Sequence, residues 1–288
     1  MPNPEDSRVY VQAIAEAEKI GAKMLMATDP DSDRVGVQVL HDGKFIALNG
    51  NQIGALLIDY LYNTRKEQDA LEKGETMVTT IVSGELGQKI ARENGIDVQQ
   101  VLTGFKYIGD KAEGFPEQGR HFFFGYEESY GCLIGTFVRD KDATQASLML
   151  CEAAAYYKAQ GKTLIDVLNG LYARFGFYLD TQSNFFFRGA DGQKKIAALT
   201  AGLRREHPAE VAGARLVRLE DYLSDETQAE GFPKSDVLRF VFSDGCWVAV
   251  RPSGTEPKCK FYYCVRAAGE AEASEKLAAL KAAFEPKD

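Results

Sequence analysis

The pattern of hydrophobic and polar positions predicts alternating helices and strands over the first 175 residues. Apolar residues recur at helical spacing in some segments and form short continuous runs in others, which is typical of parallel β-α units. We expect helices over residues 4–20, 52–62, 85–93, 143–160 and 164–175. We expect strands over residues 22–27, 35–40, 44–48, 77–82, 98–103 and 121–125, with an Asp-Gly hairpin turn between the second and the third.

The pattern changes from residue 177 onward. One strand at 177–187 and one helix at 192–206 are followed by several strands and a final helix rich in alanine, lysine and glutamate. That order favours an α+β domain with an antiparallel sheet, in which the polar stretch 224–234 is a surface loop. The predicted fold class is therefore α/β, with parallel-sheet domains followed by a C-terminal α+β domain that has an antiparallel sheet.

Composition narrows the classes of protein. A chain of 288 residues that is 45% hydrophobic can bury a substantial interior in two or three domains. The net charge of -8 argues against nucleic-acid binding, and no run of apolar residues is long enough to predict attachment to a membrane. The five cysteines are odd in number and lack CxxC spacing, so we expect reduced thiols and a cytoplasmic location.

Three aspartates at alternate positions form the strongest candidate for chemistry. Asp29, Asp31 and Asp33 point to one side of an extended loop, and carboxylate oxygens suit Mg²⁺ or Ca²⁺. An EF-hand is excluded because Arg34 stands where that loop needs glycine and Leu40 where it needs glutamate. The alternative is a solvated acidic turn, but three adjacent carboxylates repel one another unless a cation neutralises them.

A second loop, between two strand-like runs, combines phosphate-binding groups. Arg251 offers a bidentate fork, Ser253 and Thr255 offer hydroxyls, and Gly254 lets backbone N–H groups approach a ligand. The alternative is a tight turn, which would explain the proline and glycine but not the arginine, the hydroxyls and Lys258 together. We therefore predict an anion site here.

Other polar loops are weaker candidates. Glu127 and Ser129 follow a strand at the edge where ligands of parallel sheets bind, but the two glutamates of this loop, Glu127 and Glu128, could equally cap the next element. Lys106 and Lys141 lie in polar, turn-like settings, and an isolated lysine is usually a solvated surface residue. Only the neighbouring motifs can indicate whether these residues bind a ligand.

Taken together and in this order, ATDPDSDRVG, TGFKYIGDK, YEESYG, VRDKDA and RPSGTEPK resemble the α-D-phosphohexomutase superfamily. The resemblance covers the whole chain and is strongest to the phosphoglucomutase/phosphomannomutase branch, in particular its bacterial phosphoglucomutases. It implies a four-domain enzyme that interconverts glucose 1-phosphate and glucose 6-phosphate, and mannose phosphates in some members, through glucose 1,6-bisphosphate or its equivalent. It also implies domains at 1–46 (the end of domain 2), 47–175 (domain 3) and 176–288 (domain 4).

The resemblance implies a role for each matching residue. For the metal it implies Mg²⁺ on Asp29, Asp31 and Asp33, with Arg34 near the transferring phosphoryl group. For the sugar it implies hydroxyl contacts from Glu127 and Ser129, with the loop of Gly104 and Lys106 lining the opposite side. It also implies a basic segment next to the substrate, which contains Arg139 and Lys141. For the phosphate that is not transferred it implies Arg251, Ser253, Gly254 and Thr255.

Two departures from the family pattern matter. No serine here is followed by histidine, asparagine and proline, so we expect a C-terminal portion that lacks the phosphoserine domain and is inactive alone. Gly131 stands where some branches carry a histidine, which leaves Lys141 as the hypothesis for the acid/base. A stand-alone module that binds phosphosugar and Mg²⁺ without mutase activity is the alternative.

Overall fold

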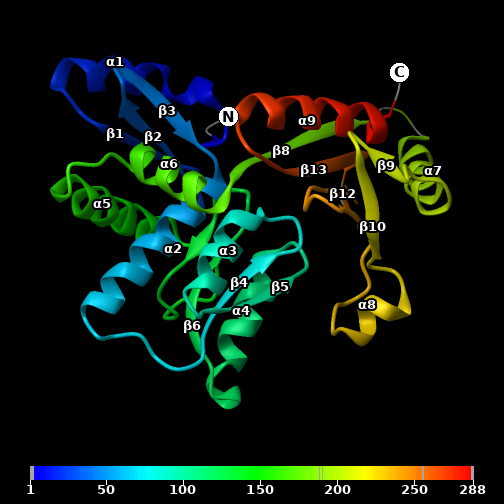
Figure 1. Ribbon diagram of the computed structural model, residues 1–288, viewed down its shortest axis with the longest axis horizontal. Coiled ribbons are helices and arrows are strands. Elements are labelled where there is room, and N and C mark those ends of the chain that lie inside the picture. The colour runs from blue at the N-terminus through cyan, green and yellow to red at the C-terminus, as the bar shows by residue number, and fades with distance from the viewer. Residues whose placement is uncertain (1–2, 188, 190, 255, 287–288) are drawn as a thin grey trace. The chain divides into compact units, whose positions relative to one another are not determined.

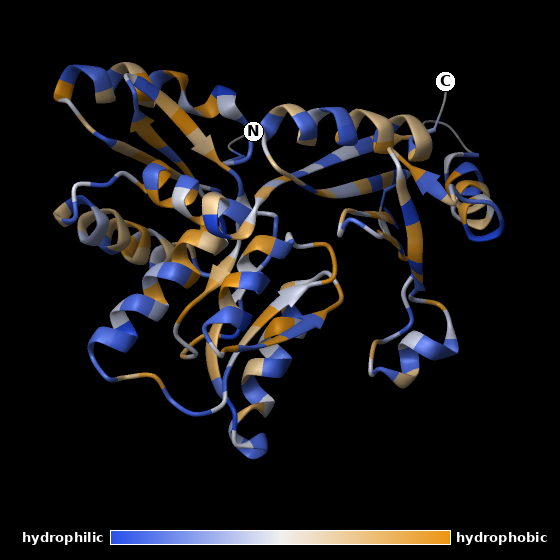
Figure 2. Cartoon of the chain, viewed as in Figure 1, coloured by the Kyte–Doolittle hydropathy of each residue, from blue (hydrophilic) through white to orange (hydrophobic). Residues whose placement is uncertain are grey.

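The computed structural model describes residues 3–187, 189, 191–254 and 256–286 (Figure 1). The chain divides into two compact units, Met1–Phe175 and Gly176–Asp288. Each unit has its own secondary structure and buried residues, so each is described by itself. Figure 2 shows hydrophilic and hydrophobic residues mixed along the helices, as expected for helices that cover a core on one side.

The first unit begins with a short helical region and a small sheet. Its elements are η1 (Ser7–Tyr10), α1 (Val11–Ile20), β1 (Met24–Thr28), β2 (Val35–His41) and β3 (Lys44–Leu48). Asp6 accepts a hydrogen bond from the Arg8 amide at the start, and Gly21 ends α1 in a left-handed conformation, as the sequence predicts. The three strands form an antiparallel sheet in the order β1-β2-β3.

The rest of the first unit is an α/β layer structure. Its elements are α2 (Gly50–Glu67), β4 (Glu75–Thr80), α3 (Glu85–Glu93), β5 (Asp97–Val101), α4 (Phe105–Gly114), η2 (Pro116–Gln118), β6 (His121–Tyr126), β7 (Cys132–Leu133), α5 (Ala143–Ala159) and α6 (Leu164–Phe175). The sheet order is β5-β4-β6-β7, in which the first three strands are parallel and β7 is antiparallel. Every residue of β4 is buried, as expected for a central parallel strand covered on both faces.

The second unit is built on one antiparallel sheet in the order β8-β13-β12-β11-β10-β9. Its elements are β8 (Phe177–Phe186), α7 (Gly192–Arg205), β9 (Glu210–Val211), β10 (Ala214–Asp221), α8 (Asp225–Ala229), β11 (Leu238–Phe242), β12 (Trp247–Pro252), β13 (Lys258–Ala267) and α9 (Glu270–Phe284). Buried residues of α7 and α9 join the alternating apolar residues of the strands in one core. The predicted fold class is confirmed.

Two local predictions are wrong. The segment after Gly104 is not turn-like, because α4 begins at Phe105 and carries Lys106 on its first turn; Ile108 and Ala112 bury the other side of this helix. The stretch 224–234 contains the short helix α8, which Ser224 caps by accepting a hydrogen bond from the Thr227 amide.

Other features follow the sequence more closely. All five cysteines are free thiols, and four of them are buried. Across the described residues, none of the helices combines the length and the apolar character needed to span a membrane. The boundary near residue 46 stays a prediction.

Candidate functional site

The loop between β1 and β2, residues 29–34, contains the three alternate aspartates and is called the aspartate loop below. Asp29, Asp31 and Asp33 each place one carboxylate oxygen so that all three atoms lie within 4.8 Å of one another. Ser32 turns the loop with a φ of 56°, in the left-handed region. The geometry therefore brings together the three side chains that the sequence pattern singled out.

Asp29 organises this loop from inside. Its side chain is buried, with Asp29 only 3% exposed, and Oδ1 accepts hydrogen bonds from the amides of Asp33 and Arg34 at 3.1 Å each. Its Oδ2 accepts from Arg34 Nε at 2.6 Å. Burial alone would raise the pKa of this carboxyl group, but the amide and Arg34 donors outweigh it and hold the pKa at about 2. Asp29 is therefore an anion at neutral pH.

Asp33 is less completely paired. Its Oδ2 lies 3.0 Å from Lys141 Nζ, whereas its Oδ1 is buried and has no hydrogen-bond partner within the described part of the chain. Arg34 Nε is 3.6 Å from that oxygen, beyond hydrogen-bond distance. Burial, with the neighbouring Asp29 carboxylate adding to it, raises the pKa of Asp33. A buried oxygen without a donor, beside two other carboxylates, fits a hard cation such as Mg²⁺.

Backbone hydrogen bonds fix the aspartate loop against the loop after β6 and the start of α5. The Val35 amide donates to the Tyr130 carbonyl oxygen at 3.1 Å, and the Ala143 amide donates to the Ser32 carbonyl oxygen at 3.0 Å. Tyr130 itself has a φ of 71°, which costs free energy in a residue other than glycine. The aspartate loop, the loop after β6 and the start of α5 therefore form one assembly.

The loop after β6 packs closely on the start of α2. A Cβ atom at Gly50 would lie 2.2 Å from the Glu128 carbonyl oxygen, so only glycine lets the helix approach this loop. Glu127 is 8% exposed, and its Oε1 accepts a hydrogen bond from the Gly104 amide at 2.9 Å. Ser129 is half-buried in the same loop. Glu127 thus joins the loop after β6 to the loop before α4.

Glycine is required at the start of α4. Gly104 has a φ of 122°, a conformation that other residues avoid. Lys106 is exposed on α4, with its ammonium nitrogen 4.9 Å from the centroid of the Tyr107 ring. These residues lie beyond the carboxyl ends of β5 and β6, where ligands of parallel sheets usually bind.

The two residues of the basic segment point to different partners. Arg139 binds Glu113 of α4, with its Nη2 2.6 Å from Glu113 Oε2. Lys141 instead contacts Asp33 in the aspartate loop. The structure therefore places Lys141, but not the Arg139 guanidinium, on the aspartate cluster.

Sequence reasoning missed polar groups at the end of β4. Thr80 Oγ1 lies 2.9 Å from Ser83 Oγ and donates to Glu128 Oε2 at 3.3 Å. The Gly84 amide donates to Asn51 Oδ1 at 2.8 Å. A Ser-Gly pair between a buried strand and a helix is the signal that could have found this group, because it lies at the carboxyl edge of the parallel sheet.

The predicted phosphate loop joins β12 and β13 in the second unit. The Ser253 amide donates to the Lys258 carbonyl oxygen at 2.8 Å, and the Glu256 amide donates to Ser253 Oγ at 3.3 Å. Arg251 is the second-to-last residue of β12, where it has no ion pair among the residues that the structure describes. Apart from its chain neighbours, none of the described residues has an atom within 4 Å of the position of a Cβ at Gly254. The predicted contact from Thr255 lies outside the described residues.

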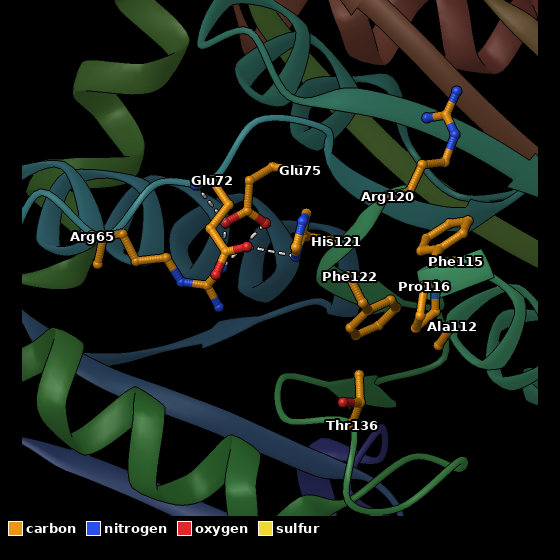
Figure 3. A pocket seen from close by; sticks show the side chains of 11 residues that line it. Arg65, Glu72, Glu75, Ala112, Phe115, Pro116, Arg120, His121, Phe122 and Thr136 are labelled. Carbon is orange, nitrogen blue, oxygen red and sulfur yellow. Dashed lines mark hydrogen bonds and ion pairs between the residues drawn. The ribbon is translucent and has the colours of Figure 1, made fainter. Parts of the chain in front are cut away.

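A separate cavity of about 370 Å³ lies at the other edge of the parallel sheet (Figure 3). Glu75 and His121, the first residues of β4 and β6, line it. Figure 3 shows its charged groups facing one another: Arg65 Nη1 lies 3.1 Å from Glu75 Oε1, and His121 Nδ1 lies 2.6 Å from Glu72 Oε2. Because Arg65 and Glu75 already pair with each other, and the buried Asp33 oxygen has no such partner among the described residues, the aspartate assembly remains the better candidate site.

Comparison with known protein families adds an independent finding. Residues 49–175 match the family model for phosphoglucomutase/phosphomannomutase, alpha/beta/alpha domain III. Residues 194–286 match the model for the phosphoglucomutase/phosphomannomutase C-terminal domain. The chain belongs to the phosphoglucomutase/phosphomannomutase family.

Curated relatives are similar to the chain in sequence. Phosphoglucomutases of Staphylococcus aureus strains bovine RF122 and USA300 are each 38% identical over 287 residues, which is 96% of this chain and 51% of the relative. The chain thus spans about half the length of the curated relatives it matches.

Solved structures show the same fold. A phosphoglucomutase of Paramecium, pp63/parafusin, has a TM-score of 0.69 at 19% identity, over 97% of this chain and 48% of that one. A putative phosphomannomutase of Thermus thermophilus has a TM-score of 0.64 at 21% identity, over 99% and 51%. The phosphohexomutase fold expected from the sequence motifs is therefore confirmed.

Proposed function

We propose that this chain supplies the metal-, sugar- and phosphate-binding part of a phosphoglucomutase that interconverts glucose 1-phosphate and glucose 6-phosphate through a bisphosphorylated sugar. Mannose phosphates are further candidate substrates. The observation that carries the proposal is the joining of the aspartate loop to the loop of Glu127 through the Val35–Tyr130 hydrogen bond. Phosphoryl transfer depends mostly on positioning and on stabilisation of charge, and this assembly offers both.

The charge of each side chain indicates which part of the substrate complex it would bind. Asp29, Asp31 and Asp33 would hold Mg²⁺, which when bound supplies Lewis-acid stabilisation of the phosphoryl oxygens. Glu127, already oriented by the Gly104 amide, can accept hydrogen bonds from sugar hydroxyls. Arg251 can grip the phosphate that is not transferred, since a guanidinium binds phosphate oxygens in a bidentate manner.

The nucleophile is proposed to come from outside these 288 residues. None of the serines in the sequence stands before histidine, asparagine and proline, the context that the family resemblance implies for the phosphoserine. We therefore propose that this chain alone has no mutase turnover and works with a serine-bearing domain. The free thiols support the cytoplasm as its compartment.

A chimera tests this proposal. The first half of the Staphylococcus aureus phosphoglucomutase, joined ahead of residue 1, should convert glucose 1-phosphate to glucose 6-phosphate, and replacing its phosphoserine by alanine should abolish turnover. The 288-residue chain alone should remain at the background rate. Turnover by the chain alone at the rate of the chimera would refute the division of labour. Calorimetry of glucose 1-phosphate binding to the chain alone provides a second readout, and absence of binding would count against the sugar and phosphate sites.

A further inference from the structure

Lys141 lies between the aspartate loop and the loop after β6, in an enclosed position that is unusual for a lysine. Its Nζ lies 3.0 Å from Asp33 Oδ2 in the aspartate loop and 3.1 Å from Asp140 Oδ1. Its side chain is only 15% exposed, and the ammonium nitrogen lies 5.2 Å from the centroid of the Phe105 ring. A lysine so enclosed is not the solvated surface residue that lysines usually are.

A glycine opens the path that this lysine takes. A Cβ atom at Gly131 would lie 2.1 Å from Lys141 Cδ and 2.7 Å from Lys141 Cγ, far inside van der Waals contact. Gly131 is not among the residues with positive φ, so its backbone conformation is one that alanine can adopt. An alanine here would therefore displace the flexible lysine rather than strain the loop.

We propose that Lys141 is an internal counter-ion of the aspartate loop, that it competes with Mg²⁺ for Asp33, and that Gly131 makes room for it. The inference rests on the proposed function, which assigns Mg²⁺ to the same loop. It adds that the metal-free loop is kept in shape by a cation that the chain itself provides.

The electrostatics explain the competition. Both carboxylate oxygens of Asp29 already accept hydrogen bonds, from Arg34 and from two backbone amides. In Asp33, one oxygen contacts Lys141 and the other has no hydrogen-bond donor among the described residues. The ammonium group reduces the repulsion between Asp29 and Asp33 while no metal is bound. A divalent cation among the same carboxylates would be repelled by that ammonium, so metal binding and the Lys141–Asp33 contact oppose each other.

The competition has a consequence for substrate binding. Once Mg²⁺ holds Asp33, the Lys141 ammonium loses its partner in the aspartate loop. It keeps only its ion pair with the exposed Asp140 and can then contact a phosphate on the substrate. Metal binding would in this way convert a structural lysine into a ligand-binding one, and Lys141 acts here as a positioning residue.

Two variants of the 288-residue chain test the inference. Lys141→Met keeps an unbranched stem without the charge, and Gly131→Ala keeps the lysine but blocks its path. Both should raise the affinity for Mg²⁺ by about tenfold, measured by titration of backbone amide resonances. Both should also speed amide exchange at Asp33 and Arg34 in the metal-free chain, because the loop loses its counter-ion. Lys162→Met, which removes an exposed lysine elsewhere, is the matched control and should change neither quantity.

The outcomes separate this inference from the proposed function. If the parent binds Mg²⁺ and Lys141→Met binds it within about twofold, the counter-ion role is wrong while the metal site stands. If Lys141→Met raises the affinity but Gly131→Ala does not, the role of Gly131 is overturned. If neither the parent nor Lys141→Met binds Mg²⁺, the metal assignment and the competition fall together.

Discussion

The aspartate loop of the first unit and the β12–β13 loop of the second are both proposed to serve a phosphosugar, yet they are built in opposite ways. In the first, Asp29 is buried and accepts three hydrogen bonds from its own loop. In the second, Arg251 has no ion pair among the described residues, and the Ser253–Lys258 hydrogen bond holds the hairpin. One loop is stabilised through its charged groups, and the other by its strands.

The difference fits the ligand that each loop is proposed to bind. Carboxylates that gather for a cation repel one another before it arrives, so the chain places Arg34 and Lys141 among them. A single guanidinium at the end of a strand meets no such repulsion and can remain open to an anion. We therefore expect substitution of the buried Asp29 in the aspartate loop to lower stability, and substitution of Arg251 in the β12–β13 loop to affect activity alone.

The largest effect should come from Asp29→Asn. An asparagine has a single acceptor oxygen and cannot accept from both the backbone amides and Arg34, so the buried position would lose some of its hydrogen bonds, and the half-buried Arg34 would keep only its ion pair with Glu5 as a close contact among the described residues. We expect the free energy of unfolding of the first unit to fall by ~3 kcal/mol, measured by urea denaturation. Asp31→Asn, at an exposed position in the same loop, should stay within ~0.5 kcal/mol of the parent. Equal effects at the two positions would contradict the account.

Arg251→Ala should show the opposite behaviour. In the chimeric enzyme, kcat/KM should fall by roughly 10- to 150-fold, equivalent to ~1.5–3 kcal/mol, because a charge-assisted contact with phosphate is lost. The loss should be similar for glucose 1-phosphate and glucose 1,6-bisphosphate. Urea denaturation of the same variant should move by less than ~0.5 kcal/mol. A kcat/KM within about twofold of the parent would mean that the β12–β13 loop is an ordinary turn.

Glu127→Gln tests the loop after β6. We expect a smaller effect on activity than that of Arg251→Ala. The amide oxygen of glutamine can still accept from Gly104, so the fold should be retained. The loss of charge should change the ratio of kcat/KM for glucose and mannose 1-phosphates by about tenfold. Unchanged selectivity would remove Glu127 from the sugar-binding residues.

The smallest predicted effect is a change in the pH dependence of stability, and it comes from Asp221 in the second unit. Burial alone would raise the pKa of Asp221, but hydrogen bonds from Arg204 outweigh it and leave the pKa lowered. A carboxyl group with a lowered pKa stabilises the fold above its unfolded pKa of about 4, and this contribution is lost as the pH falls through the folded value. Thermal unfolding of Asp221→Asn should therefore depend less on pH below about 4 than the parent does. An identical dependence would exclude Asp221 as a source.

The sequence predicted the parts of the molecule whose signals are local. The alternate aspartates, the Asp42-Gly43 hairpin and the helix from Glu85 to Glu93 depend on neighbours a few residues away, and the structure has all three. The contact of Lys141 with Asp33 joins residues more than a hundred positions apart, and the space at Gly131 exists only in the folded chain. Periodicity carries no information on such contacts.

The start of α4 was missed for a different reason. The apolar residues Phe105, Ile108 and Ala112 have helical spacing, but the glycine and lysine between them read as a polar loop. Burial of that face against the parallel sheet outweighs the weak local propensity.

The most direct test of the account is a Mg²⁺ titration of the 288-residue chain, followed through the amide resonances of the aspartate loop. The account predicts saturable shifts at residues 29–34, weak in affinity because a further anionic ligand comes from outside this chain, and their loss when Asp29, Asp31 and Asp33 are all replaced by asparagine. A triple variant that responds to Mg²⁺ as the parent does would contradict it.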